Sequence, residues 1–396
     1  MKLSINSWLL IAINTIHSTI DLFISTFLVA YFLNITNNNI VPAATFYMFT
    51  YFISMVGFPL LGPLVKSNKK KYIYNFSFIV NAILLLLIIY LKESSINHIW
   101  LLGLILGFEK ICYWFPQNVF ISQIATGNQI IKFNGYKSGL AGAVKIITPI
   151  FFGWLITIDS FINTIVFVLF LTILEFALSN LVALPIKKEK PFNILHLSAF
   201  AIKKASIKLS LVVEMMRGFS SNVLDILIVL YIVHIFKTNL NLGIFTSIFA
   251  VCTVLVNIIF GKCCKFKQFT LLIWICSILT FLSIIYFVFD TTKLSFIVYN
   301  LIYASAWQII STIIDVNIYK ISQDKFVSLH HREEYLALRE FFLCFGRILG
   351  FGFLIIIALL QNFDTIKYLI LFFGTILMIM SYFSIKLCNK LAKQYV

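Results

Sequence analysis

Residues 72–91 read YIYNFSFIVNAILLLLIIYL and contain no charged side chain. The short polar segment KESSINH follows at residues 92–98, and a second long apolar run, beginning IWLLGLILGF, starts at residue 99. About 20 helical residues cross the hydrocarbon core of a bilayer. Backbone groups in lipid must be paired within a helix or a closed barrel, and these runs are too long and continuous for barrel strands. Two membrane-spanning helices joined by a short loop are therefore predicted.

The same pattern of long apolar runs and short polar loops continues along the whole chain. Hydrophobic residues make up 61% of the sequence and charged residues 12%, and the mean hydropathy is +0.98. Soluble proteins carry about 25% charged residues. We therefore expect an all-α integral membrane protein with about twelve transmembrane helices. The predicted spans are 8–32, 40–65, 72–91, 99–122, 138–158, 161–185, 209–235, 240–261, 269–289, 294–319, 336–360 and 366–388.

The basic side chains alternate between the two sides of the predicted membrane. The formal net charge is +16, but the cations do not gather on one soluble face, so nucleic acid is not an expected partner. With both termini on one side, the loops of the other side hold only Lys92, Lys237, Lys293 and Lys367. Basic residues concentrate in cytoplasmic loops. We therefore expect a multi-pass protein of the cytoplasmic (inner) membrane, surrounded by membrane lipids, with both termini in the cytoplasm.

The chain divides into two similar halves. GPLVKSNKKK at residues 62–71 follows the second predicted span, and GKCCKFKQF at residues 261–269 follows the eighth. With these Gly-led basic loops and its six-plus-six pattern, the whole chain resembles the major facilitator superfamily in topology. The loop of that family usually carries an acidic residue four positions after the Gly, whereas Lys66 stands there in this sequence. Only the basic character of the loop is therefore carried over.

The resemblance implies two pseudo-symmetric six-helix bundles. The first would comprise residues 1–185 and the second residues 209–396, joined by a basic cytoplasmic central loop at 186–208. In that fold the first, fourth, seventh and tenth spans line a central cavity. The polar side chains of those spans are therefore candidates for a substrate or proton pathway.

Polar side chains in the first and seventh spans follow the same spacing of three and four residues, which places each set on one helix face. The sets are Asn14, His17, Asp21 and Ser25 in the first span and Glu214, Arg217, Ser221 and Asp225 in the seventh. The fourth and tenth spans repeat the theme with Glu109, Lys110, Gln117, Gln308 and Asp315. Ionisable groups at bilayer depth are costly and should face a partner or a water-filled cavity.

Proton coupling follows as a hypothesis. Asp21 with His17 one turn away, and Glu109 beside Lys110, could load and release protons as a cavity changes sides. Glu175 in the sixth span is a weaker candidate. The alternative for His17 is a hydrogen-bonding packing residue.

The fifth and eleventh spans each contain one cation, Lys145 and Arg347. Both have glycines nearby, which allow close helix contacts. One interpretation is that the two cations bind an anionic group of a substrate, since Arg can hold a carboxylate or phosphate through two hydrogen bonds. The alternative is that they neutralise buried carboxylates.

The densest charged segment is ISQDKFVSLHHREEYLALREFF at residues 321–342. Together with the basic loop after the second span it could form a cytoplasmic gate, or its acids could simply favour the start of a helix. The gate candidates are Lys69, Lys70, Arg332, Glu333, Arg339 and Glu340. His330 and His331 do not make a metal site by spacing alone, and no CxxC pair is present, so neither a metal nor a cofactor is expected.

These features favour a secondary active transporter, a symporter or antiporter, and not an enzyme with catalytic residues. Its substrate would be a small solute, with an anionic or zwitterionic one favoured, moved by alternating access and coupled to protons. We expect it to work as a monomer. The alternatives are a lipid or amphiphile exporter or flippase on the same scaffold and, less favoured, a membrane-embedded lipid-modifying enzyme.

Overall fold

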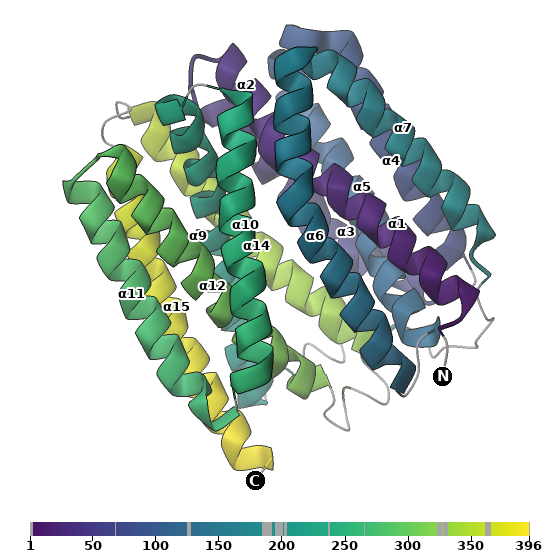
Figure 1. Cartoon of the computed structure of the whole chain (residues 1–396). Helices are drawn as coiled ribbons and strands as arrows, with labels where there is room; N and C mark the ends of the chain where they lie inside the picture. The colour runs from purple at the N-terminus through teal and green to yellow at the C-terminus, as the bar shows by residue number, and fades with distance from the viewer. Residues whose placement is uncertain are drawn as a thin grey trace. The chain divides into compact units, whose positions relative to one another are not determined.

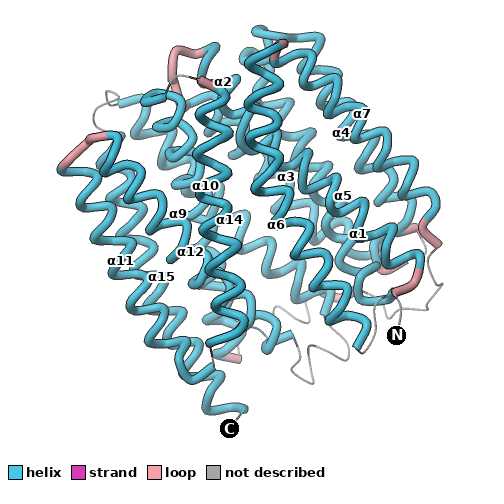
Figure 2. The backbone as a smooth tube through the Cα atoms, viewed as in Figure 1, coloured by secondary structure: helices cyan, strands magenta, loops and turns pink. Residues whose placement is uncertain are grey.

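The computed structural model describes residues 3–67, 69–124, 128–183, 192–194, 201, 204–236, 238–264, 266–322, 327, 332–360 and 366–395. Helices joined by short loops make up this part of the chain, and no strand occurs within it (Figure 2). The predicted all-α class is confirmed. The physical reason is the one read from residues 72–91: long apolar runs can satisfy their backbone groups in lipid only as helices.

The chain forms two compact units. Unit 1 comprises Met1–Phe192 and Val229–Ser247, and unit 2 comprises Asn193–Ile228 and Ile248–Val396. We predicted that residues 229–247 belong to the second half, and in the structure they cluster with unit 1. Most of the predicted central loop at 186–208 lies outside the described residues. The boundaries of the two six-helix bundles stay a prediction.

The helices of the first part of the chain are labelled in Figure 1. They are α1 (Ile5–Leu22), the π-helical segment η1 (Phe23–Leu28), α2 (Val29–Ile35), α3 (Val41–Val65), α4 (Lys70–Leu91), the 3₁₀ segment η2 (Lys92–His98), α5 (Ile99–Ile124), α6 (Asn128–Ile158) and α7 (Phe161–Leu181). α1, η1 and α2 form one continuous helical stretch, Ile5–Ile35. α5 packs against both α3 and α4, whereas α3 and α4 scarcely touch each other.

The second part of the chain continues the same architecture. Its helices are α9 (Ala205–Phe236), α10 (Asn239–Cys263), the short η3 (Phe266–Gln268), α11 (Phe269–Phe289), α12 (Lys293–Ser322), α14 (Arg332–Leu360) and α15 (Ile366–Tyr395). Because unit 1 includes Val229–Ser247, α9 and α10 each contribute residues to both units.

The described residues contain 11 helical stretches long and apolar enough to cross a membrane. One of them, Lys70–Ile121, covers 52 residues and contains most of both α4 and α5, which we predicted as separate spans at 72–91 and 99–122. The structure is thus consistent with the predicted twelve spans.

Close helix contacts occur beside the charged side chains of each unit. Gly107 of α5 lies against the backbone carbonyl of Thr50 in α3, and Gly218 of α9 lies against the carbonyl of Leu343 in α14. A Cβ atom at either glycine would overlap that oxygen, so only glycine allows this approach. The contacts fix α5 near Glu109 and α9 near Arg217.

Candidate functional site

A group of charged side chains is buried inside unit 1, and we call it the histidine cluster: His17 and Asp21 of α1, Glu109 and Lys110 of α5, and Glu175 of α7. His17 Nε2 lies 3.6 Å from Asp21 Oδ2 and 3.8 Å from Glu109 Oε1, and His17 Nδ1 lies 3.3 Å from Glu175 Oε1. Lys110 Nζ donates to Asp21 Oδ1 at 2.9 Å. One imidazole therefore contacts three carboxyl groups from three helices.

The histidine cluster is enclosed by aromatic rings. The His17 ring stacks on Tyr113 with 3.3 Å between ring centroids, and Trp114 meets it edge-on at 5.8 Å. Asn14 donates from Nδ2 to Tyr113 Oη at 3.5 Å. His17, Glu109 and Glu175 are almost fully buried. The ion pairs of these buried groups are thus held in an apolar surround, where charge interactions are stronger than in water.

The helix of Asp21 changes its winding just after that residue. α1 ends at Leu22 and the π-helical segment η1 begins at Phe23. π-Helical turns inside an α-helix occur frequently at functional sites. Ser25, which continues the predicted polar stripe, lies in the π segment with its side chain exposed, so the stripe ends at Asp21.

A second group of charged side chains lies in unit 2, and we call it the arginine cluster: Glu214 and Arg217 of α9, Asp315 of α12, and Arg339 and Glu340 of α14. Glu214 is buried, with Oε1 3.3 Å from Arg217 Nη1 and Oε2 3.5 Å from Arg339 Nε. Arg217 Nη1 also donates to Asp315 Oδ1 at 2.9 Å. Arg339 Nη1 lies 3.7 Å from Glu340 Oε1. The side chains of Asp315 and Glu340 are 55% and 24% exposed.

Polar neighbours extend the arginine cluster. Arg217 Nη2 donates to Ser311 Oγ at 2.6 Å, and its guanidinium lies 6.0 Å from the centroid of the Trp307 ring. This is the distance range of a cation–π contact. The planar guanidinium thus bonds to an acid and a hydroxyl of α12 and lies near an aromatic ring of the same helix.

Three further predicted residues of unit 2 lie in smaller polar contacts. Gln308 Nε2 donates to Asn257 Oδ1 at 3.1 Å. Tyr303 Oη donates to Asp225 Oδ1 at 3.5 Å. Arg347 Nε donates to Asn222 Oδ1 at 2.7 Å. Their polar partners come from within unit 2, so each has a structural role whether or not it also contacts a solute.

Two predicted pathway residues of unit 1 stand apart from the histidine cluster. The amide atoms of Gln117 are buried with no hydrogen-bond partner among the described residues. Lys145 has an exposed side chain and makes no ion pair with a described carboxylate. Within the described residues, Lys145 therefore does not neutralise a buried acid, which was one of its two interpretations.

The predicted gate residues do not form one group. Lys69 is exposed at the turn before α4, whereas Lys70 is buried. Arg339 and Glu340 belong to the arginine cluster. Glu333 lies in the first turn of α14, and the side chain of Arg332 lies outside the described part. The gate role of these residues stays a prediction.

Several side chains in or beside the predicted site were underestimated from sequence. Glu175 was a weaker candidate, yet it makes the shortest of the three carboxyl contacts with His17. Tyr113, Ser311 and Asn222 were not among the predicted site residues. The signal for Glu175 was a lone carboxyl in the middle of an apolar span, whereas nothing in sequence spacing indicates a hydroxyl or amide partner on a distant helix.

The clusters also bear on metal binding. Among the residues that the structure describes, no group of three His, Cys, Asp or Glu side chains has an arrangement that could hold a metal ion. In the histidine cluster, the three carboxyl groups each contact the imidazole of His17 and do not surround a common centre.

The comparison with models of protein families gives a match over most of this chain. The sequence profile of the Major Facilitator Superfamily matches residues 7–351. A Bacillus subtilis (strain 168) protein, named only as uncharacterized protein YqgE, is 23% identical over 317 residues, which cover 78% of this chain and 72% of YqgE.

Solved structures show the same fold at low sequence identity. A bacterial homologue of the iron transporter ferroportin, in an inward-facing state, has a TM-score of 0.66 and 13% identity, covering 96% of this chain and 98% of its own. The nucleoside transporter NupG has a TM-score of 0.67 and 13% identity, with 98% of each chain covered. The human organic anion transporter MFSD10 (TETRAN) has a TM-score of 0.67 and 9% identity, covering 96% of this chain and 98% of that one.

Proposed function

The chain belongs to the major facilitator superfamily, and on that premise we propose that it is a proton-coupled secondary transporter of a small anionic or zwitterionic solute. It would work by alternating access, as a monomer, in the cytoplasmic membrane with both termini in the cytoplasm. The charged clusters supply the coupling and part of the solute pathway. The solute named for each similar structure belongs to that protein, and here it only widens the set of solutes to test.

The observation that carries the proposal is the composition of the histidine cluster. Three carboxyl groups surround one ammonium group and one imidazole, and Glu109 and Glu175 are nearly inaccessible. Burying an uncompensated charge costs roughly several kcal/mol for each group. With every carboxyl ionised and His17 neutral, two negative charges would lack a counter-charge, so the cluster is stabilised by binding protons.

The geometry gives those protons alternative positions. His17 contacts Glu175 through one ring nitrogen and both Asp21 and Glu109 through the other. A proton can therefore be shared between α7 on one side of the ring and α1 or α5 on the other. Chains of Asp, Glu and His inside membrane helices serve as proton relays in transporters. Solute binding that alters the Asp21–Lys110 pair would change how tightly the cluster holds its protons.

A reconstituted system tests the coupling directly. Purified protein in proteoliposomes would be screened for uptake of nucleosides, organic anions and amino acids, with and without an imposed pH gradient. The wild type should accumulate one class of solute only with the gradient. Asp21→Asn and Glu109→Gln should abolish gradient-driven accumulation and retain solute exchange without a gradient. The control is Glu93→Gln, an exposed acid in η2, which should behave as wild type. Full gradient-driven activity in both cluster variants would contradict proton coupling.

The two cations outside the clusters test the charge of the solute. Lys145→Gln and Arg347→Gln should each raise the KM for an anionic solute about tenfold, the loss of one charge-assisted hydrogen bond of about 1.5 kcal/mol. For an uncharged solute of similar size, KM should stay unchanged. Equal KM changes for both solutes would show that Lys145 and Arg347 act on structure and not on the charge of the solute.

A further inference from the structure

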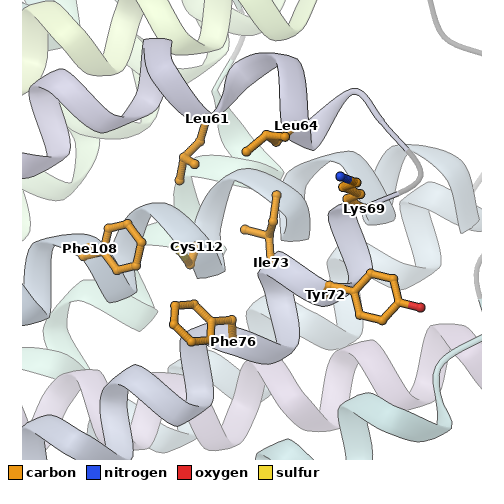
Figure 3. Close-up of a pocket in the computed structure, with 8 residues that line it drawn as sticks. All are labelled: Leu61, Leu64, Lys69, Tyr72, Ile73, Phe76, Phe108 and Cys112. Carbon is orange, nitrogen blue, oxygen red and sulfur yellow. The ribbon is translucent and has the colours of Figure 1, made fainter.

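A groove at the surface of unit 1 is lined by no residue of the charged clusters. Its volume is about 440 Å³, and its lining residues are Leu61, Leu64, Lys69, Tyr72, Ile73, Phe76, Phe108 and Cys112 (Figure 3). α3 and α4 form its walls and α5 forms its floor, because α5 packs against both helices while they scarcely touch each other. Binding sites for small molecules are usually about 300–1,000 Å³, so the groove can hold a ligand.

The groove is continuous with a lipid-facing surface. Leu60 and Leu64 of α3 and Phe76 and Ile79 of α4 are large apolar side chains that the fold leaves exposed. In a chain that spans a membrane, such side chains face acyl chains instead of water. The interior of the groove is apolar as well, since Phe108 and Ile73 lie within it. An acyl chain can therefore enter it without leaving an apolar environment.

Polar groups lie at one end of the groove only. In Figure 3, Lys69 and Tyr72 lie at one end and Phe108 at the other. Lys69 immediately precedes α4, so its ammonium group adds to the positive end of that helix dipole. None of the lining residues is acidic. This end of the groove therefore favours a negatively charged group.

Lys69 differs from the other lysines of its loop. Lys71 Nζ donates to the carbonyls of Asn180 and Val182, Lys66 lies over the Phe192 ring, and Lys70 is buried. Lys69 is exposed, and its side chain makes no ion pair or hydrogen bond with another described residue. Its charge is thus available to a ligand.

We propose that this groove binds an anionic phospholipid, with one acyl chain between α3 and α4 and the phosphate at Lys69 and Tyr72. The lipid would come from the leaflet at the end of unit 1 where Asn6 bonds to Ala183 and Lys71 bonds to Val182. In the proposed orientation this is the cytoplasmic leaflet. The site goes beyond solute transport and does not depend on the identity of the solute. It also gives Lys69 a different role from the gate predicted from sequence.

Native mass spectrometry of the purified protein tests the proposal. The protein would be released from nanodiscs that contain equal amounts of phosphatidylglycerol and phosphatidylcholine of the same chain length. Wild-type protein should retain one phosphatidylglycerol molecule in preference to phosphatidylcholine. Lys69→Gln should lower the phosphatidylglycerol-bound fraction about fivefold, the factor for about 1 kcal/mol from one lysine at a membrane surface. Ile73→Trp, which fills the groove, should lower it as well, whereas Lys69→Arg should retain it.

The matched control is Lys267→Gln, because Lys267 is an exposed lysine in the corresponding basic loop of unit 2. It should bind phosphatidylglycerol as the wild type does. The proposal is overturned if Lys69→Gln retains wild-type binding, if Lys267→Gln loses as much as Lys69→Gln, or if Ile73→Trp has no effect. Displacement of the lipid by inorganic phosphate alone would also overturn it, since the site would then recognise a free anion. None of these results depends on transport, so the proposed function can fail while the lipid site stands.

Discussion

Each charged cluster is centred on one basic side chain that contacts several acids, but the two clusters differ in their balance of acids and cations. His17 and Arg217 each lie three residues after the first polar residue of a stripe. Each of them contacts acids from more than one helix. In the histidine cluster, two buried carboxyl groups, Glu109 and Glu175, share one imidazole. In the arginine cluster, one buried carboxyl group, Glu214, lies between two guanidinium groups.

This difference separates a cluster that can change its charge from one that cannot. Imidazole gains and loses a proton near neutral pH, whereas guanidinium remains charged in proteins. The additional acids of the arginine cluster, Asp315 and Glu340, are partly exposed to solvent and need no further counter-charge. We therefore propose that protons are exchanged in unit 1 and that the charges of unit 2 form a fixed electrostatic frame. Three predictions follow from this contrast.

The largest expected difference between the clusters comes from neutralising one buried acid in each of them. Glu214→Gln leaves Arg217 and Arg339 without their shared counter-charge and should lower the free energy of unfolding by about 3–5 kcal/mol. Glu175→Gln removes one carboxyl from a cluster with more acids than cations. It should lower the free energy of unfolding by less than about 1 kcal/mol. Denaturant unfolding in detergent micelles measures both. Equal losses would show that the two clusters do not differ in charge balance.

A smaller effect is expected when the cation is exchanged and its charge is kept. Arg217→Lys should cost about 1–2 kcal/mol, because an ammonium group cannot reproduce the fork that reaches Asp315 and Ser311 together. In the other cluster, Lys110→Arg replaces a single contact to Asp21 and should cost less. The same unfolding measurement ranks the pair. A larger loss of unfolding free energy for Lys110→Arg would mean that the Asp21–Lys110 pair depends more strongly on the shape of its cation than Arg217 does.

The smallest effect is spectroscopic. Single-tryptophan variants that keep only Trp114, beside His17, or only Trp307, near Arg217, report on each cluster. The fluorescence would be measured from about pH 5 to pH 10, a range that covers most histidine pKa values in proteins. Trp114 emission should rise as the imidazole loses the proton that quenches it. Trp307 emission should stay constant, and His17→Phe should remove the Trp114 titration. A Trp114 titration that survives His17→Phe would assign the proton to another group.

The fold was predictable because its cause is local. The segment 72–91 needs only its own composition to become a helix in lipid, and the segment that follows it, 92–98, is short and polar. The same reasoning predicted the polar stripes, since a spacing of three and four residues places Asn14, His17 and Asp21 on one face wherever the helix lies.

The partners of those stripes were only partly predictable. The pairs Asp21–Lys110 and Arg217–Asp315 join helices far apart in the chain, and spacing within one span does not select a partner in another. Arg339 shows the limit most clearly. Its charged surroundings indicated a surface gate, yet its side chain reaches the buried Glu214. The helix that carries it is brought close by glycine contacts such as that of Gly218 with α14.

The sequence by itself determined that this protein is a bundle of membrane helices with ionisable groups on selected faces, because hydropathy and helix period act within single segments. Only the tertiary structure decided which of those groups share a cluster and how many cations each buried acid receives. It also decided that α3 and α4 leave a groove over α5. These properties depend on distances between segments, which are set by the packing of whole helices and by the few glycines that let them approach.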